Sequence, residues 1–366
     1  MNKLETVSSW QLAILFIAFT TGSAIIYVPD SLLNAAKNGA WISIILASAI
    51  SFFLLTVTLY LHRKYPGMTW IDYSRKTVGS VLTVLLSIPF LTMVLLMLCL
   101  IIIGLGGFFT STMMRQTPPY MFHLFTLLVA ALTVRAGIEA MARMFTLLLF
   151  SMYVTVIVVF LFSIPYYRPE LLLPVMPEGI KPVLHGSYIL VFPYGEVILF
   201  SMLLPFVKKE KKPRIRKLMF SALLLNTLTL LTVVICTVMA LGPVAGERVY
   251  SLFQMARLIE IADIIERIES VIGIQLTLGT YMKATIALFI LNLGVTRLFK
   301  LDDDRVLVLP LAFLSFLLTL VMFRNEAEYV KMVQVNWPLV VIVCGVVPVM
   351  FIALASLFRR KGSAGR

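Results

Sequence analysis

Two charged side chains stand inside stretches that are otherwise apolar enough to cross a membrane. Glu196 lies in "ILVFPYGEVILF" (189–200), and Lys283 lies in "LGTYMKATIALF" (278–289). A charge near the middle of a bilayer is costly unless it is paired, protonated or in contact with a ligand. Three roles therefore stay open for Glu196: a neutral acid that donates to a freed backbone carbonyl, a contact for a ligand ammonium, or an ion pair with Lys283.

Residues that interrupt helices stand beside Glu196 and also in the first apolar stretch. Pro193 removes a backbone donor and Gly195 permits unusual φ, while "TTGS" (20–23) collects four poor helix formers. Backbone polar groups must be satisfied in hydrocarbon, so we expect both breaks to face protein or a cavity. Freed N–H groups favour an anionic ligand group and freed carbonyls favour a cation, so an amino acid suits both. The alternative is a simple proline kink in each helix.

The elements that position these residues are membrane helices. The chain has 366 residues, of which 60% are hydrophobic and 13% charged, which is too apolar for a soluble domain. We predict an all-α integral membrane protein with one transmembrane domain over residues 1–366 and about ten spans. The spans are expected at 11–35, 40–61, 80–109, 120–134, 144–165, 184–206, 218–241, 270–296, 306–323 and 337–358.

The breaks fall in the first and sixth of these spans. This spacing is typical of two inverted five-helix repeats, here about 10–165 and 184–358, with a substrate site at their interface. Asp30 lies near the outer end of the first span and is expected to reach water at the interface. The long connection "RVYSLFQMARLIEIADIIERIES" has helical apolar spacing, which predicts an amphipathic outer helix at about 248–269. That helix would either gate the outer mouth or be an ordinary interfacial helix.

The distribution of basic residues indicates how the chain is oriented in the membrane, and it does not indicate a nucleic-acid partner. The formal net charge of +13 comes from Lys and Arg that gather in alternate connections, above all in "KKEKKPRIRK" (208–217). By the positive-inside rule both termini are cytoplasmic. The chain shows no P-loop, GxSxG or HExxH motif, and its three His and three Cys have no metal-ligand spacing. We therefore expect no enzymatic activity, no cofactor, no metal and no nucleic-acid binding.

Several segments resemble the B subunit of bacterial spore germinant receptors. They are "YVPDSLLNAAKNGAWIS", "YPGMTWIDYSRKTVG", "MPEGIKPVLHGSYILVFPYGEVILFSMLLPF" and, most specifically, "IEIADIIERIES". The resemblance implies the amino acid, polyamine and organocation transporter superfamily with its leucine-transporter-like fold. It also implies the inner membrane of the endospore, an A subunit and a lipoprotein C subunit as partners, and a small germinant, often an amino acid, that triggers germination.

The resemblance also implies where the ligand binds. The unwound parts of the first and sixth helices fall on two groups of candidate ligand-binding residues: Thr21, Gly22 and Ser23, and Phe192, Pro193, Tyr194, Gly195 and Glu196. Lys283 is the candidate intramembrane charge partner, in the neighbourhood where related transporters hold sodium. The family's pocket also uses the third helix, where Gly104, Gly106 and Gly107 would let another backbone approach closely. The alternatives to a receptor are an amino-acid permease and a channel for water or ions.

Overall fold

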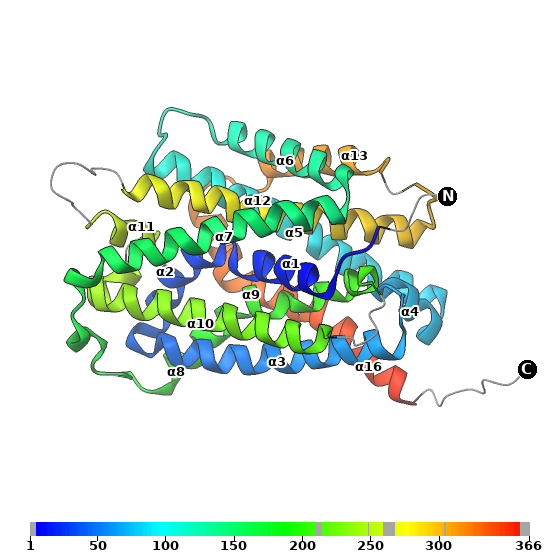
Figure 1. Ribbon diagram of the computed structural model, residues 1–366, viewed down its shortest axis with the longest axis horizontal. Helices are drawn as coiled ribbons and strands as arrows, with labels where there is room; N and C mark the ends of the chain where they lie inside the picture. Colours follow the sequence, from blue (N-terminus) through cyan, green and yellow to red (C-terminus); the bar gives the residue numbers. More distant parts are fainter. Residues whose placement is uncertain are drawn as a thin grey trace, which may run out of the picture.

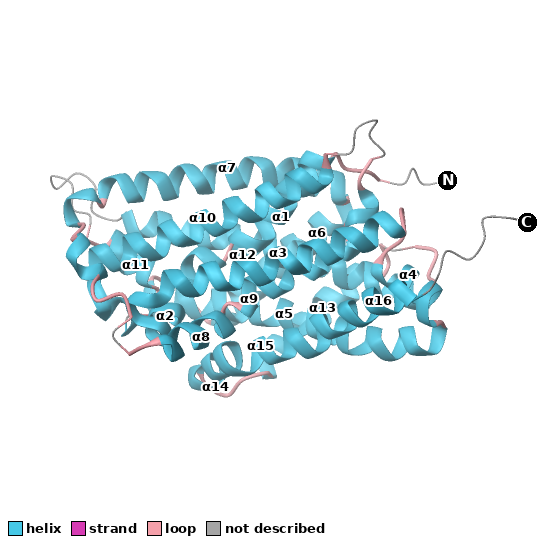
Figure 2. Cartoon of the chain, turned by 90° about the horizontal axis from the view of Figure 1, so that it is seen from below, coloured by secondary structure: helices cyan, strands magenta, loops and turns pink. Residues whose placement is uncertain are grey.

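The computed structural model describes residues 5–176, 178–208, 214–247, 249–258, 268–303 and 305–358. Within these ranges the chain is helical, and the one extended pairing is an isolated bridge between Val7 and Val207. Most long helices run along the longest axis of the molecule, and the first and last described residues, Glu5 and Phe358, lie at the same end of the bundle (Figure 1). We call this the termini end. Figure 2 shows the same bundle of helices joined by short loops.

All ten predicted spans appear as helical segments. Seven described helical runs are long and apolar enough to cross a membrane, and an eighth span is a pair of helices bent by 58°. In chain order the segments are α1 (Ser9–Thr21) with α2 (Ala24–Ala36), α3 (Ala40–Lys64), α5 (Ser80–Thr112), α6 (Pro119–Ala136), α7 (Ile138–Phe162), α8 (Ile180–Ile189) with α9 (Val191–Tyr194) and the 3-10 helix Gly195–Met202, α10 (Ile215–Leu241), α12 (Ile268–Phe299), α13 (Val308–Val321), and α14 (Glu326–Lys331) continued by α15 (Trp337–Val340) and α16 (Val347–Phe358).

The last span begins earlier than its hydropathy suggests. It starts at Glu326 rather than at Trp337, because Asn325 caps it by accepting a hydrogen bond from the Glu328 backbone at 2.9 Å. Two π-helical turns, Met332–Asn336 and Val341–Val346, interrupt the span without ending it. Hydropathy marks only the part of a helix that lies in lipid, so polar first turns such as this one are missed.

The two broken helices and α12 form the centre of the bundle. In α1 nearly every side chain from Leu12 to Thr21 is buried, and α12 packs against α1, α5, α6 and α7. The outer faces of α3, α7 and α13 carry exposed Leu, Ile and Phe side chains. A helix that is apolar all round belongs in the interior or in lipid. Around the breaks the broken helices are therefore positioned by protein, while the far end of α8 exposes Ile180 and Leu184.

Two short α-helices of the described chain lie in the connections between spans. Near the termini end, α4 (Trp70–Val78) follows α3 and starts with a capping box between Thr69 and Asp72. At the other end, α11 (Ser251–Ala256) falls within the predicted amphipathic helix, and Leu252, Phe253 and Met255 are buried against the bundle. Residues 259–267, which include Glu260, Asp263 and Arg267, lie outside the described residues. The described turn thus packs on the bundle.

Candidate functional site

The first break separates α1 from α2 at Gly22 and Ser23. Thr21 ends α1, and its hydroxyl accepts a hydrogen bond from the Asn226 amide of α10 at 2.9 Å. Gly22 lies directly on Gly279 of α12, so a Cβ atom at Gly22 would stand 2.6 Å from the Gly279 carbonyl oxygen. Glycines permit this approach of two backbones. Most of the first break is therefore used for helix packing.

The second break lies at Phe192, one residue before the proline. Its ψ of −128° is far from helical, and the helical segments Ile180–Ile189 and Val191–Met202 are inclined to each other by 58°. Gly195 has an ordinary right-handed conformation, with φ −75° and ψ −27°, so the break does not use the unusual φ that a glycine permits. The Tyr194 carbonyl accepts a hydrogen bond from the Ser51 hydroxyl at 2.9 Å. One carbonyl at the break is thus satisfied by α3.

Glu196 and Lys283 form a buried ion pair behind the second break. The Lys283 Nζ atom lies 2.8 Å from Glu196 Oε2, and neither side chain is exposed. Among the described residues neither of these two atoms has a hydrogen-bond partner. The Lys283 ammonium also lies 4.3 Å from the centre of the Phe192 ring and 5.1 Å from that of Phe19. Of the three roles left open for Glu196, the structure shows contact with Lys283.

Trp337 connects this pair to a cavity. The Trp337 Nε1 group donates a hydrogen bond to Glu196 Oε1 at 3.2 Å, while the indole also lines a cavity of about 90 Å³ beside both breaks. A single water molecule needs a cavity of roughly 10–15 Å³, so this cavity is large enough for a small solute. The cavity is lined by Ser23, Tyr27, Val28, Asp30, Ser31, Met97, Leu100, Ile101, Ile189, Leu190, Phe192, Val249, Tyr250, Glu326, Tyr329, Val330, Val333, Gln334 and Trp337.

The structure divides the candidate ligand-binding residues into two groups. Ser23 and Phe192 line the cavity. The other six do not line it. The Thr21 hydroxyl accepts a hydrogen bond from Asn226, Gly22 packs on Gly279, and the Tyr194 hydroxyl donates to Thr227 at 3.3 Å. Pro193, Gly195 and Glu196 are buried outside the cavity lining.

Sequence reasoning missed the side chains that line most of the cavity. Asp30, expected at the interface, is half-buried in the cavity wall, where it accepts a hydrogen bond from the Ser31 backbone at 2.8 Å. Tyr250 and Tyr329 come from the outer connection and the tenth span. Burial raises the pKa of the Tyr250 hydroxyl, so it stays neutral. The sequence does show polar side chains on α2 and α14 that the predictions did not assign to the site. Amphipathic spacing alone does not tell whether such side chains face a cavity or solvent.

The glycines of the third span make room for side chains rather than for a backbone. A Cβ atom at Gly104 would stand 2.5 Å from the Tyr329 hydroxyl and 3.2 Å from that of Tyr27. At Gly106 it would stand 2.5 Å from the His123 ring. The expected close backbone approach is therefore wrong for Gly104 and Gly106. Gly104 lets two tyrosines reach the cavity.

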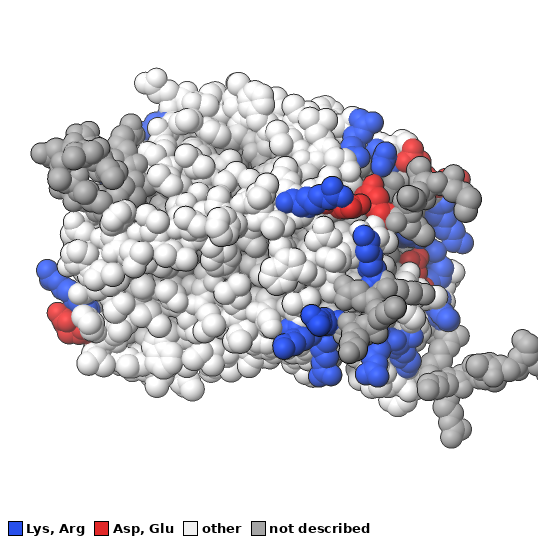
Figure 3. Space-filling model, in the orientation of Figure 1, with Lys and Arg blue, Asp and Glu red and all other residues white. Residues whose placement is uncertain are grey.

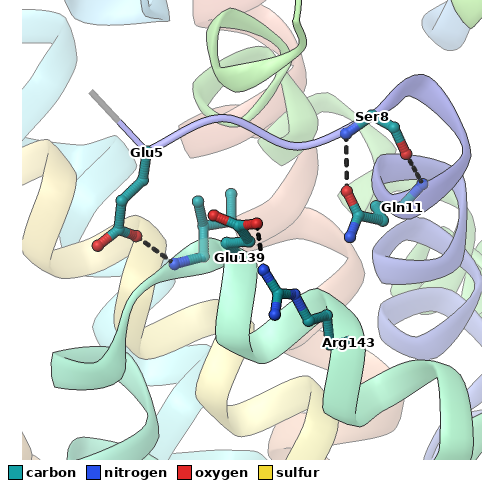
Figure 4. Close-up of polar contacts among 6 residues, drawn as sticks. Glu5, Ser8, Gln11, Glu139 and Arg143 are labelled. Carbon is teal, nitrogen blue, oxygen red and sulfur yellow. Dashed lines mark hydrogen bonds and ion pairs between the residues drawn. The ribbon is translucent and has the colours of Figure 1, made fainter. Parts of the chain in front are cut away.

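The segment before α1 fastens the termini end of the bundle. Glu5 accepts a hydrogen bond from the Ile138 backbone at 2.9 Å, at the start of α7, and Ser8 and Gln11 form the capping box of α1 (Figure 4). Val7 exchanges backbone hydrogen bonds of 2.9 Å with Phe206 and Lys208, which follow the second broken helix. These contacts hold the two broken helices together at the side away from the cavity.

A second, polar cavity of about 750 Å³ lies at this end. Glu5, Arg75, Asn292, Arg297 and Arg305 are among its lining residues. The Arg305 guanidinium donates to Glu5 at 3.3 Å, and both side chains are partly exposed, so the pair contributes little to stability. The Glu196–Lys283 pair is not part of either cavity wall.

Comparison with solved structures gives the fold. The structure matches that of MhsT in complex with L-phenylalanine with a TM-score of 0.66, over 96% of this chain and 99% of that chain, at 13% sequence identity. At this identity the match carries the architecture alone. It is the leucine-transporter-like architecture, with two inverted five-helix repeats and broken first and sixth helices, so the predicted fold class is confirmed.

Comparison with known sequences gives the family. Spore germination protein KB of Bacillus subtilis (strain 168) is 25% identical over 89% of this chain and 87% of its own length. Spore germination protein YndE of the same organism is 22% identical over 99% of both chains, and spore germination protein XB of Bacillus anthracis is 22% identical over 78% of this chain and 79% of its own. The model of the spore germination protein family matches residues 6–328. The chain is an integral membrane protein that belongs to the spore germination protein family.

Proposed function

We propose that this chain is the membrane subunit of a nutrient germinant receptor, which binds a small germinant, such as an amino acid, in the cavity between the two helix breaks. The observation that carries the proposal is that Ser23 of the first break and Phe192 of the second line one small cavity. Membership of the spore germination family supports the biological role.

The Glu196–Lys283 pair would pass ligand binding on to the rest of the bundle. Phe192 and Trp337 each line the cavity and contact one member of the pair. A germinant changes the receptor only if it binds one conformation better than the other. A ligand that shifts either aromatic ring changes the contacts of a pair whose charges have few other partners, and so favours one arrangement of α12 against the broken helices.

The family and the distribution of charge support a proposal for the placement in the cell and for the partners. The receptor would lie in the inner membrane of the endospore with an A subunit and a lipoprotein C subunit, and it would need neither nucleic acid nor an enzymatic step. On the face in Figure 3 most Lys and Arg gather at the termini end. The positive-inside rule then favours cytoplasmic termini and an outer position for the 90 Å³ cavity.

Trp337→Phe tests the proposed coupling. The variant keeps an aromatic cavity wall but removes the hydrogen bond to Glu196. We expect spores that carry it to need about tenfold more nutrient for half-maximal germination, which corresponds to about 1.4 kcal/mol. Trp10→Phe is the matched control, because Trp10 is 61% exposed and outside the cavity. A Trp337→Phe response equal to wild type contradicts the coupling.

An amino-acid permease is the second candidate, and the 750 Å³ cavity at the termini end favours it. Transport needs access from both sides of a central site, and this cavity would provide the second side. Counterflow uptake into vesicles that contain this chain alone would support the permease. Activity that requires the partner subunits would support the receptor.

A further inference from the structure

The cavity beside the two breaks carries charge of one sign. Its charged lining side chains, among the described residues, are Asp30 and Glu326, and no Lys, Arg or His faces it. The nearby Lys283 is fully buried behind Phe192 and pairs with Glu196. A ligand carboxylate would therefore find no cationic side chain in the cavity, whereas a ligand cation would find one or two carboxylates.

Three tyrosines surround the acidic side of the cavity. Tyr27, Tyr250 and Tyr329 line it, and the ring centres of Tyr27 and Tyr250 lie 5.9 Å apart. A cation is attracted to an aromatic face within about 6 Å of the ring centre. The Tyr27 hydroxyl is buried and has no hydrogen-bond partner among the described residues, so it can accept an N–H donor. Tyr329 instead donates to the Leu100 carbonyl at 3.3 Å.

Asp30 is held in place by the backbone around it. Its carboxylate accepts hydrogen bonds from the Ser31 backbone at 2.8 Å and from the Tyr250 backbone at 3.4 Å. A carboxylate has about four acceptor sites, so two contacts leave room for a ligand. The rest of the wall is mostly aliphatic, with Val28, Ile101 and Val333 among its residues.

We infer that this cavity recognises the ammonium group of a small organic amine through Asp30 and the three tyrosines, and that a ligand carboxylate is dispensable. The inference rests on the proposed function for the location of the site, and it adds which chemical group of the ligand the site recognises. The aliphatic wall favours an organic cation over an inorganic one, because hydrated metal ions gain nothing from apolar contact.

Binding of simple probes to the purified full chain tests this inference. The fluorescence of Trp337 reports on the cavity that it lines, and Trp337→Phe identifies its share of the signal. The probes are n-propylammonium, L-alaninamide, L-alanine, n-propanol and propionate at pH 7, with NaCl and KCl at equal ionic strength. We expect saturable changes with the three ammonium compounds, at concentrations about tenfold below those at which n-propanol acts, and none with propionate or salt.

Variants at Asp30 complete the test. Asp30→Asn should weaken binding of the amines at least about tenfold, and Asp30→Glu should restore part of it. Glu139→Gln removes one negative charge on α7 outside the cavity and should bind as wild type does. Thermal unfolding shows whether each variant is folded.

Several outcomes would overturn the inference. They are propionate binding as tightly as the amines, saturation by KCl or NaCl alone, unchanged affinity in folded Asp30→Asn, or no saturable signal with any amine. Propionate binding that Val333→Phe abolishes would refute the ammonium preference but leave the cavity as the ligand site, so the two proposals fail separately.

Discussion

The two helix breaks look alike in sequence, but their residues make different kinds of contact. Contacts within the protein occupy most of the first break: Gly22 lies on Gly279, and the Thr21 hydroxyl accepts a hydrogen bond from Asn226, so that only Ser23 lines the cavity. The second carries a buried ion pair and an aromatic ring that faces the cavity. The first break thus fixes how closely helices approach, and the second places a charge where a ligand can affect it.

Removing one charge of the pair should have the largest effect. Lys283→Met leaves the Glu196 carboxylate buried without its cation, which should cost about 3–5 kcal/mol of stability. The double variant Glu196→Gln with Lys283→Met should recover most of that loss, because no buried charge remains. Thermal unfolding in detergent and abundance in membranes measure both.

The response of the double variant sharpens the comparison. If the double variant folds but its spores no longer germinate in response to nutrient, the second break is a signalling element. If Lys283→Met alone is as stable as wild type, the pair is not a buried ion pair in the folded protein and the contrast between the breaks is lost.

Gly22→Ala should have the next largest effect. Its Cβ atom would stand 2.6 Å from two backbone oxygens, those of Ala18 and Gly279, and backbone cannot move aside cheaply. Overpacking of this kind costs about 1–3 kcal/mol. We expect lower thermal stability together with a weaker nutrient response. Unchanged stability would show that α1 and α12 do not approach so closely.

Gly195→Ala should have the smallest effect. The nearest atoms to the new methyl group would belong to the side chains of Val191 and Val341, both at 3.0 Å, and the backbone conformation suits alanine. The change in stability should stay within about 1 kcal/mol, since the steric cost is offset by a less flexible unfolded chain. A loss as large as that of Gly22→Ala, measured by the same unfolding assay, would make the two breaks equivalent.

Local chemistry made the breaks predictable, but not their partners. Polar residues, glycine and proline in hydrocarbon are a local signal, so the chain was expected to interrupt its helices near Gly22 and Pro193, as it does. The contacts of Gly22 with Gly279 and of Glu196 with Trp337 join residues more than 140 positions apart. Packing of the whole bundle decides such contacts, and no spacing within one helix reveals them.

The central claim is that the nutrient binds in the cavity between the two breaks. The most direct test is the nutrient dose response of spores with Val333→Phe, which fills the cavity, against Val335→Phe on the same π-helical turn, where the side chain is 51% exposed. With both receptors present at wild-type abundance, we predict that Val333→Phe raises the half-maximal nutrient concentration by at least about tenfold and that Val335→Phe leaves it unchanged. Equal, wild-type responses from both variants would contradict the claim.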